Sequence, residues 1–260
     1  MNRQPSLFIS HGSPMMPLQQ IPAKDFLRSL GPALGRPNAI LMISAHWDTE
    51  RPAVSAAERP ETIYDFYGFP PALYQLRYPA PGAPQLAEKV ARLLKKHGLA
   101  ADIDPDRGLD HGAWSPLLQM YPEADIPVTQ LSIQSHLGPA HHLKLGEALR
   151  PLRDEGVLVL ASGGAIHNLH EARFQRDSPV VEPWATEFNE WLANAVLARR
   201  LDDLTNYRTR APHGARSHPT DEHFIPLFAA LGAADPDGKT ARLHTSINAG
   251  SISMDAYRFD

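Results

Sequence analysis

Four short apolar runs mark the strands that this chain is predicted to form. They lie at residues 7–9, 39–43, 128–133 and 157–160, and most positions in them are apolar. A run with few polar interruptions is typical of a strand buried on both faces, as in a parallel sheet covered by helices. The sequence therefore predicts parallel strands at the centre of the fold.

Segments with helical spacing lie between and after these runs. Residues 85–97 repeat apolar positions every three or four residues and carry two lysines in the last turn, and residues 143–149 form a shorter candidate. Residues 183–200 begin with proline, which a helix accepts readily only in its first turn. Residues 219–231, like residues 85–97, end immediately before a glycine, which is a common helix stop.

The alternation of strands and helices predicts the fold class. We expect residues 1–260 to form a single α/β domain with a mostly parallel central sheet flanked by helices. Residues 52–82 show neither the helical nor the strand spacing of apolar residues, and they are predicted to form a long, aromatic-rich loop, called the excursion below. Residues 244–254 contain a further strand-like stretch at 251–254.

Composition and charge restrict the classes of partner. The chain has no cysteine, which excludes disulfides, thiolate metal sites, iron–sulfur clusters and a cysteine nucleophile. With 25 basic and 29 acidic residues the formal charge is −4, so neither nucleic acid nor a membrane surface is expected as a partner. No apolar run approaches the roughly 18 residues of a membrane span, and residues 1–5 show no apolar signal core. A cytoplasmic enzyme is therefore expected.

Each predicted strand is followed closely by a histidine. These are His11, His46, His136 and His167. Ligands of open α/β sheets bind beyond the carboxyl ends of the strands, and neighbouring strands lie only about 5 Å apart. A single histidine at such a position could be a helix cap or a packed polar residue. Four together predict a divalent metal site, because neutral imidazole is the commonest metal ligand in proteins.

Two further histidines have sequence surroundings that suit a functional site. His111 lies between Asp110 and a glycine in a loop that enters a helix, where it could be a positioned acid or base, or a helix cap. His223 follows Asp221 and Glu222 near the start of the last predicted helix, where it could face a pocket or cap a core helix. Two neighbouring histidines on a helix are expected at the surface: His141 and His142.

Several common catalytic motifs are missing from the sequence. It contains no Gly-x-Ser-x-Gly elbow, no Walker loop and no Gly-x-Gly-x-x-Gly after a strand. The stretch from His167 to His170 lacks the glutamate of a His-Glu-x-x-His zinc protease. Serine hydrolase, nucleotide-binding and zincin chemistry are therefore disfavoured.

An ordered set of motifs resembles a known family. In chain order these motifs are Ser10-His11-Gly12-Ser13-Pro14, Ser44-Ala45-His46-Trp47, Tyr67-Gly68-Phe69-Pro70 leading to Tyr78-Pro79-Ala80-Pro81-Gly82, Leu109-Asp110-His111-Gly112-Ala113-Trp114, Gly163-Gly164-Ala165-Ile166-His167-Asn168-Leu169, and His218-Pro219-Thr220-Asp221-Glu222-His223-Phe224. Together they resemble the DODA-type (4,5-DOPA) extradiol ring-opening dioxygenases, relatives of the LigB-type catalytic subunits. The resemblance spans roughly residues 6–253, and its specificity lies in the ordered set.

The resemblance implies a site for one divalent metal per chain. It implies that His11, His46 and His223 bind the metal, and that His167 either joins them or acts as the catalytic base. His111 matches a catalytic histidine near the substrate hydroxyls. The wider LigB-like pattern has a glutamate as third ligand where this chain has a histidine, and the two carboxylates directly before that histidine are alternative ligands.

The implied activity is extradiol ring cleavage of a catechol. We expect an L-DOPA-like small-molecule substrate and O₂ to react at Fe(II) and give a muconic semialdehyde, with Zn(II) an expected occupant of a purified sample. Four aromatic side chains of the excursion could either line the pocket around the substrate ring or serve ordinary loop packing: Tyr64, Phe66, Tyr67 and Phe69. The alternatives are a zinc-dependent hydrolase that uses the same histidines, and a metal- or tetrapyrrole-binding protein without turnover.

Overall fold

One large sheet organises the part of the chain that the computed structural model describes, residues 3–174 and 180–260. Eight strands pair in the order β4 (Asp102–Asp104), β3 (Ala53–Ser55), β5 (Val128–Ile133), β2 (Ala39–Asp48), β6 (Val157–Gly163), β1 (Ser6–Ser10), β10 (Ala256–Phe259) and β7 (Thr240–His244). A separate two-stranded ribbon joins β8 (Ile247–Asn248) to β9 (Ile252–Ser253).

The centre of the sheet is parallel, and antiparallel pairs lie on both sides of it, while the edge strand β4 again pairs in parallel with β3. Strands β5, β2, β6 and β1 pair in parallel, whereas β10, β7 and the β3–β5 contact are antiparallel. The α/β fold with a mostly parallel central sheet is thus confirmed. The four central parallel strands are the four predicted ones, and the prediction missed the outer strands β3, β4, β7 and β10.

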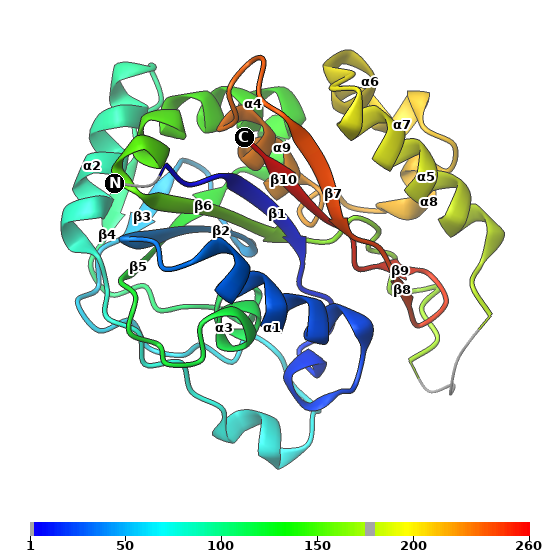
Figure 1. Cartoon of the computed structure of the whole chain (residues 1–260), viewed down its shortest axis with the longest axis horizontal. Coiled ribbons are helices and arrows are strands. Elements are labelled where there is room, and N and C mark those ends of the chain that lie inside the picture. Colours follow the sequence, from blue (N-terminus) through cyan, green and yellow to red (C-terminus); the bar gives the residue numbers. More distant parts are fainter. Residues whose placement is uncertain (1–2, 175–179) are drawn as a thin grey trace.

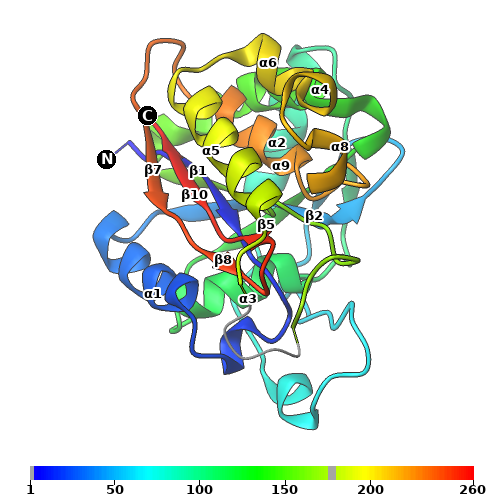
Figure 2. The ribbon, with the colours of Figure 1, turned by 90° about the vertical axis from the view of Figure 1, so that its right-hand side faces the viewer.

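Helices cover both faces of the sheet (Figures 1 and 2). Successive residues of β2 enter opposite layers: Leu41 and Ile43 belong to one core cluster and Ile40 and Met42 to the other. One layer contains α2 (Pro84–Lys96), α4 (Gly138–Leu149), α5 (Pro183–Leu197), α6 (Leu201–Thr205), α7 (Tyr207–Arg210), α8 (Gly214–Ser217) and α9 (Ile225–Gly232), and the other contains α1 (Pro22–Leu34) and α3 (His111–Met120). Two-sided burial explains why the runs at residues 7–9, 39–43 and 157–160 contain no polar residue.

Among the described residues there are also four short 3₁₀ helices: η1 (Met16–Leu18), η2 (Pro71–Gln75), η3 (Ser135–Leu137) and η4 (Arg150–Glu155). The aromatic-rich excursion at residues 52–82 therefore contains β3 and η2. Within residues 3–174 and 180–260, no helix combines the length and apolar character needed to cross a membrane.

The last predicted helix begins later than expected. The sequence pattern placed its start at residue 219, but α9 begins at Ile225. Pro226 lies in the first turn of α9, where its missing N–H costs no hydrogen bond. The residues before it form a turn closed by the Phe224 N–H donating to the carbonyl of Asp221 at 2.9 Å. This turn carries His223.

The prediction that His142 lies at the surface is wrong. His142 is fully buried, and its ring is satisfied on both sides. Its Nδ1 lies 2.8 Å from the carbonyl of Gly138, and its Nε2 accepts from the Gln134 N–H at 3.1 Å. Neighbouring residues of a helix point about 100° apart, so one of the pair faces inward while His141 stays half-buried.

Buried neutral histidines are expected to make stability depend on pH. Burial lowers the pKa of His218 to about 3, well below the 6.5 of an unfolded chain. The unfolded state therefore takes up a proton below pH 6.5 that the folded state does not, and the free energy of unfolding falls as pH drops from 6.5 towards 3. Replacing His218 with Phe, beside the rings of Phe188 and Phe224, should reduce this slope by up to about 1.4 kcal/mol per pH unit.

Urea unfolding of metal-free protein at pH 7, 6 and 5 measures this slope. The matched control is His97→Gln, which changes an exposed histidine at the end of α2 and should leave the slope unchanged. An identical slope in wild type and His218→Phe would contradict the prediction.

Candidate metal centre

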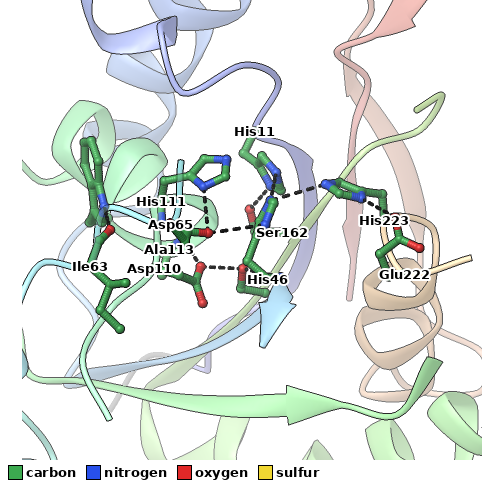
Figure 3. A network of polar contacts seen from close by, with 12 residues as sticks. His11, His46, Ile63, Asp65, Asp110, His111, Ala113, Ser162, Glu222 and His223 are labelled. Carbon is green, nitrogen blue, oxygen red and sulfur yellow. Dashed lines mark hydrogen bonds and ion pairs between the residues drawn. The ribbon is translucent and has the colours of Figure 1, made fainter. Parts of the chain in front are cut away.

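Three histidines from distant parts of the sequence meet at the carboxyl ends of the central strands (Figure 3). His11 directly follows β1, and His46 lies near the end of β2, where the pairing of β2 with β5 is irregular. His223 lies in the turn before α9. The strands β1, β6 and β2 are adjacent in the sheet, which brings the first two histidines to one edge.

The Nε2 atoms of these three rings converge. His46 Nε2 lies 3.0 Å from His11 Nε2 and 3.2 Å from His223 Nε2. One ligand atom from each residue can be chosen so that all lie within 4.8 Å of one another. His11 and His223 are buried, and His46 is 22% exposed. The centre is thus shielded from bulk water on most sides.

The opposite nitrogen of each ring faces an oxygen. The Nδ1 atoms lie 2.9 Å from Ser162 Oγ in His11, 3.3 Å from Asp65 Oδ2 in His46, and 3.1 Å from Glu222 Oε1 in His223. Carboxylates can only accept hydrogen bonds, so the Nδ1 atoms of His46 and His223 carry the proton. Their Nε2 lone pairs then point to the shared space, which is the arrangement of metal-binding imidazoles with their supporting oxygens.

Burial keeps these imidazoles neutral. It lowers the pKa of His11 and of His223 well below the usual 6.5, and the neighbouring imidazoles lower both further. For His46, burial and then His111 lower the pKa to about 4, although Asp110 and Asp65 act in the opposite direction. Neutral imidazole is the form that binds a metal.

The donor set fits one divalent ion. Nitrogen lone pairs that face one another at 3.0–3.2 Å repel unless a proton or a cation lies between them. Nitrogens bonded to a common ion at about 2.0–2.1 Å are separated by about 3.0–3.4 Å, which matches these spacings. Three neutral imidazoles also leave coordination positions for substrate, as catalytic metal sites require.

Two glycines allow the surrounding elements to approach the centre. A Cβ at Gly163, the last residue of β6, would lie 2.1 Å from the carbonyl oxygen of His223. A Cβ at Gly112 would lie 2.4 Å from Ser44 Oγ and 3.0 Å from His46 Cδ2. Only glycine lets the His223 turn dock on β6 and the first turn of α3 pack against His46.

The other two predicted site histidines flank the three. The ring of His167 stacks on His223 with centroids 3.4 Å apart and planes 9° apart. Burial lowers the pKa of His167 to about 4, against an opposing effect of Glu222. His111 lies on the other side, with its ring centroid 4.0 Å from that of His46. All five predicted site histidines are therefore in one cluster.

The expectation that His136 joins the cluster is wrong. His136 lies in η3 with 47% of its side chain exposed, and its Nε2 is 4.0 Å from Glu50. The reason is strand order: β5, which precedes it, pairs with β2 on the side away from β6 and β1. The third converging imidazole is that of His223 instead.

Asp110 caps the N-terminus of α3, so the side chain of His111 is not needed as the cap. The Asp110 side chain accepts from the Ala113 N–H at 3.2 Å and from Ser44 Oγ at 2.6 Å, and it is fully buried. The sequence left open whether His111 caps a helix or is a positioned acid or base. The structure shows that the cap is Asp110 and not His111. Its Nδ1 lies 2.9 Å from Asp65 Oδ2.

No pattern in the sequence indicated two residues that contact the cluster. Ser162 belongs to the apolar run of β6, and Asp65 lies in the aromatic-rich excursion, which has no period to interpret. Only the adjacency of β1 and β6 could have indicated Ser162, since it pairs with Ile9 two residues before His11.

A cavity of about 490 Å³ opens beside the histidines, within the range of small-molecule sites. Its lining includes the imidazoles of His46, His111, His167 and His223. The rest of the lining is largely apolar and forms the apolar wall, which includes Pro14, Met15, Phe69, Leu169, Phe174 and Ile252.

The four aromatic residues that could line this cavity have different positions. Phe69 lines it. Phe66 packs edge-on against the ring of His111 at 5.6 Å, and Tyr64 donates its hydroxyl to the carbonyl of Leu76 at 2.8 Å. Tyr67 is 93% exposed. One of the four therefore forms the wall, and Phe66 supports the histidine behind it.

The fold and the site together define an α/β protein with a candidate metal centre of histidines at the strand ends. The chain belongs to the family described as the catalytic LigB subunit of aromatic ring-opening dioxygenase, whose model matches residues 5–259. The resemblance inferred from the ordered motifs is thus confirmed. The family and the three converging histidines together indicate a single metal site.

Individual relatives agree with this membership. The chain is 47% identical over 262 residues to a 4,5-DOPA dioxygenase extradiol of Beta vulgaris, covering 99% of this chain and 97% of the relative. It is 44% identical to one of Escherichia coli K12, with 97% and 93% covered. The crystal structure of an uncharacterized protein from Escherichia coli K12 superposes with a TM-score of 0.83 at 37% identity, covering 99% of this chain and 100% of that one.

Proposed function

We propose that this protein is a non-haem extradiol dioxygenase that opens the ring of an L-DOPA-like catechol with O₂ to give a muconic semialdehyde. The observation that carries the proposal is the convergence of three neutral imidazoles beside a cavity with an apolar wall, with His46 Nε2 lying 3.0 Å from His11 Nε2 and 3.2 Å from His223 Nε2. The names of the relatives from Beta vulgaris and Escherichia coli support the catechol class. We place the activity in the cytoplasm, on a free small molecule.

In this proposal His11, His46 and His223 hold the metal. When bound, Fe(II) supplies the positive charge that favours an ionised catechol and the electron transfer that O₂ requires. Ser162 and Glu222 hold the rings of His11 and His223 by their Nδ1 atoms. The three rings therefore keep their orientation while substrate and product exchange.

His111 and His167 are the proposed catalytic residues. Hydrogen-bonding of His111 Nδ1 to Asp65 leaves its Nε2 as an acceptor, and His111 lines the cavity where a catechol hydroxyl would lie. His167 is neutral at pH 7, because burial lowers its pKa to about 4. Its ring stacks on His223, and its ligand atom groups with those of Glu222 and His223 but not with those of His11 and His46, so we assign it as a base that takes a catechol proton.

The apolar wall contributes by excluding water. Side chains such as Phe69, Leu169 and Ile252 would pack against the faces of an aromatic ring and orient its hydroxyls towards the histidines. Orientation of this kind supplies much of the rate of a two-substrate reaction.

Loading the protein with Fe(II) or Zn(II) tests the proposal. The Fe(II) form, supplied aerobically with L-DOPA and a panel of simple catechols, should consume one O₂ per ring opened and form a yellow semialdehyde. The Zn(II) form should consume none, because zinc has no redox chemistry. Oxygen electrode traces and absorbance spectra measure both. Absence of O₂ uptake across the panel, with ester or amide hydrolysis by the Zn(II) form, would instead favour a zinc-dependent hydrolase.

A further inference from the structure

A single carboxylate contacts two histidines of the cluster at once. Asp65 Oδ2 lies 2.9 Å from His111 Nδ1 and 3.3 Å from His46 Nδ1 (Figure 3). Asp65 Oδ1 accepts from the backbone N–H of His111 at 2.9 Å. Both oxygens of this side chain are thus directed at the centre, although Asp65 lies on the excursion between β3 and α2.

We propose that Asp65 is a positioning residue that sets the tautomer and orientation of His46 and His111 together. This inference rests on the proposed function, which assigns His46 to the metal and His111 to the substrate. An ionised carboxylate offers only acceptors, so both Nδ1 atoms that face it carry a proton. The Nε2 atom of His46 is then free for the metal, and that of His111 is free for a substrate hydroxyl.

The local electrostatics agree with an ionised Asp65. Burial, the largest single influence, acts to raise the pKa of its carboxyl, but the hydrogen bonds and electrostatic attraction of His111, together with the attraction of His46, lower the pKa to about 2. The side chain is 22% exposed, so the charge keeps some contact with water.

The backbone around Asp65 is braced on α3, which lets one carboxylate hold two rings. The indole N–H of Trp114 donates to the carbonyl of Ile63 at 2.9 Å. The rings of Tyr64 and Phe66, on either side of Asp65, pack on Trp114 with centroids 6.2 and 6.3 Å away. The position of Asp65 is therefore determined by contacts other than its own with the histidines.

An asparagine cannot replace this carboxylate. If the amide nitrogen takes the place of Oδ2, it presents donors to two Nδ1 atoms that already carry protons. If it takes the place of Oδ1, it faces the backbone N–H of His111. Either orientation opposes donor to donor, so Asp65→Asn should disturb both rings. Asp65→Glu keeps two acceptors and changes only the reach, so its effect should be smaller.

Metal affinity tests the proposal without relying on activity. Competition for Zn(II) against a chromophoric chelator should show binding weakened about 10- to 100-fold in Asp65→Asn, the range known for groups that support metal ligands, and 3- to 10-fold in Asp65→Glu. Glu61→Gln, which removes a charge from an exposed position of the same loop, is the matched control and should bind as wild type. Circular dichroism and the unfolding midpoint establish that each variant is folded.

A double variant tests whether Asp65 affects catalysis by positioning His111. At saturating Fe(II), Asp65→Asn should lower kcat at least 10-fold in the wild-type background but less than twofold when His111 is already alanine. A general structural defect would lower kcat equally in both backgrounds.

The experiments on Asp65 can fail or succeed independently of the experiment that tests the proposed function. A wild-type protein that consumes no O₂ with any catechol would end the proposed function, while chelator competition would still decide the role of Asp65. Zn(II) binding by Asp65→Asn within threefold of wild type would overturn the inference, as would additive effects in the double variant. If Asp65→Asn does not fold, Asp65→Glu decides alone: an affinity loss above threefold supports the inference, and a smaller one overturns it.

Discussion

Replacing His223 with alanine should remove the bound metal and lower kcat/KM for a catechol by about 10³-fold or more. Only two imidazoles would remain at the centre, fewer than the three protein ligands usual for a catalytic metal. A metal that stabilises charge contributes several kcal/mol to catalysis, and each 1.4 kcal/mol is a factor of about ten in rate. His11→Ala should have the same effect. Metal content per chain and O₂ uptake measure both consequences.

His136→Ala is the matched control for this prediction. Like His11, His136 follows a strand of the central sheet, but it is exposed and outside the cluster. Its loss should leave metal content and kcat/KM within about twofold of wild type, as for most surface substitutions. A full complement of metal together with wild-type turnover in His223→Ala would show that the ion binds elsewhere.

Replacing His167 with asparagine should lower kcat by about 10² to 10⁴-fold while the protein keeps one metal ion. This is the usual contribution of a general acid or base. The metal should remain because the ring of His167 stacks on His223 and stands outside the three converging nitrogens. The pKa of about 4 keeps the His167 imidazole unprotonated throughout the neutral range. Steady-state kinetics with metal analysis on the same samples measures both quantities.

His170→Asn provides the comparison on the same loop. His170 is exposed and lies three residues from His167, so its substitution should change kcat by less than about twofold. If His167→Asn loses its metal, His167 is a ligand and not the base. If kcat is unchanged, the proton is taken by another group, with His111 the next candidate because it also lines the cavity.

The sequence alone determined the central strands and the class of chemistry. Runs such as residues 39–43 and 157–160 predict buried parallel strands because burial on both faces leaves no polar alternation. His11 and His46 could be assigned to the strand ends for the same reason. The ordered motifs then identified the family, which the match over residues 5–259 confirms.

Other features could not be predicted because they depend on contacts between distant residues. His136 and His11 have equivalent local surroundings, yet only His11 enters the cluster, because β1 lies beside β6 in the sheet while β5 lies beyond β2. Asp65 meets His46 and His111 only through the packing of its loop on α3. The pattern of apolar and polar residues within one segment indicates whether that segment is a helix or a strand and which of its faces are buried. Which strand ends and loops meet is decided by strand order and side-chain packing, and these exist only once the whole chain has folded.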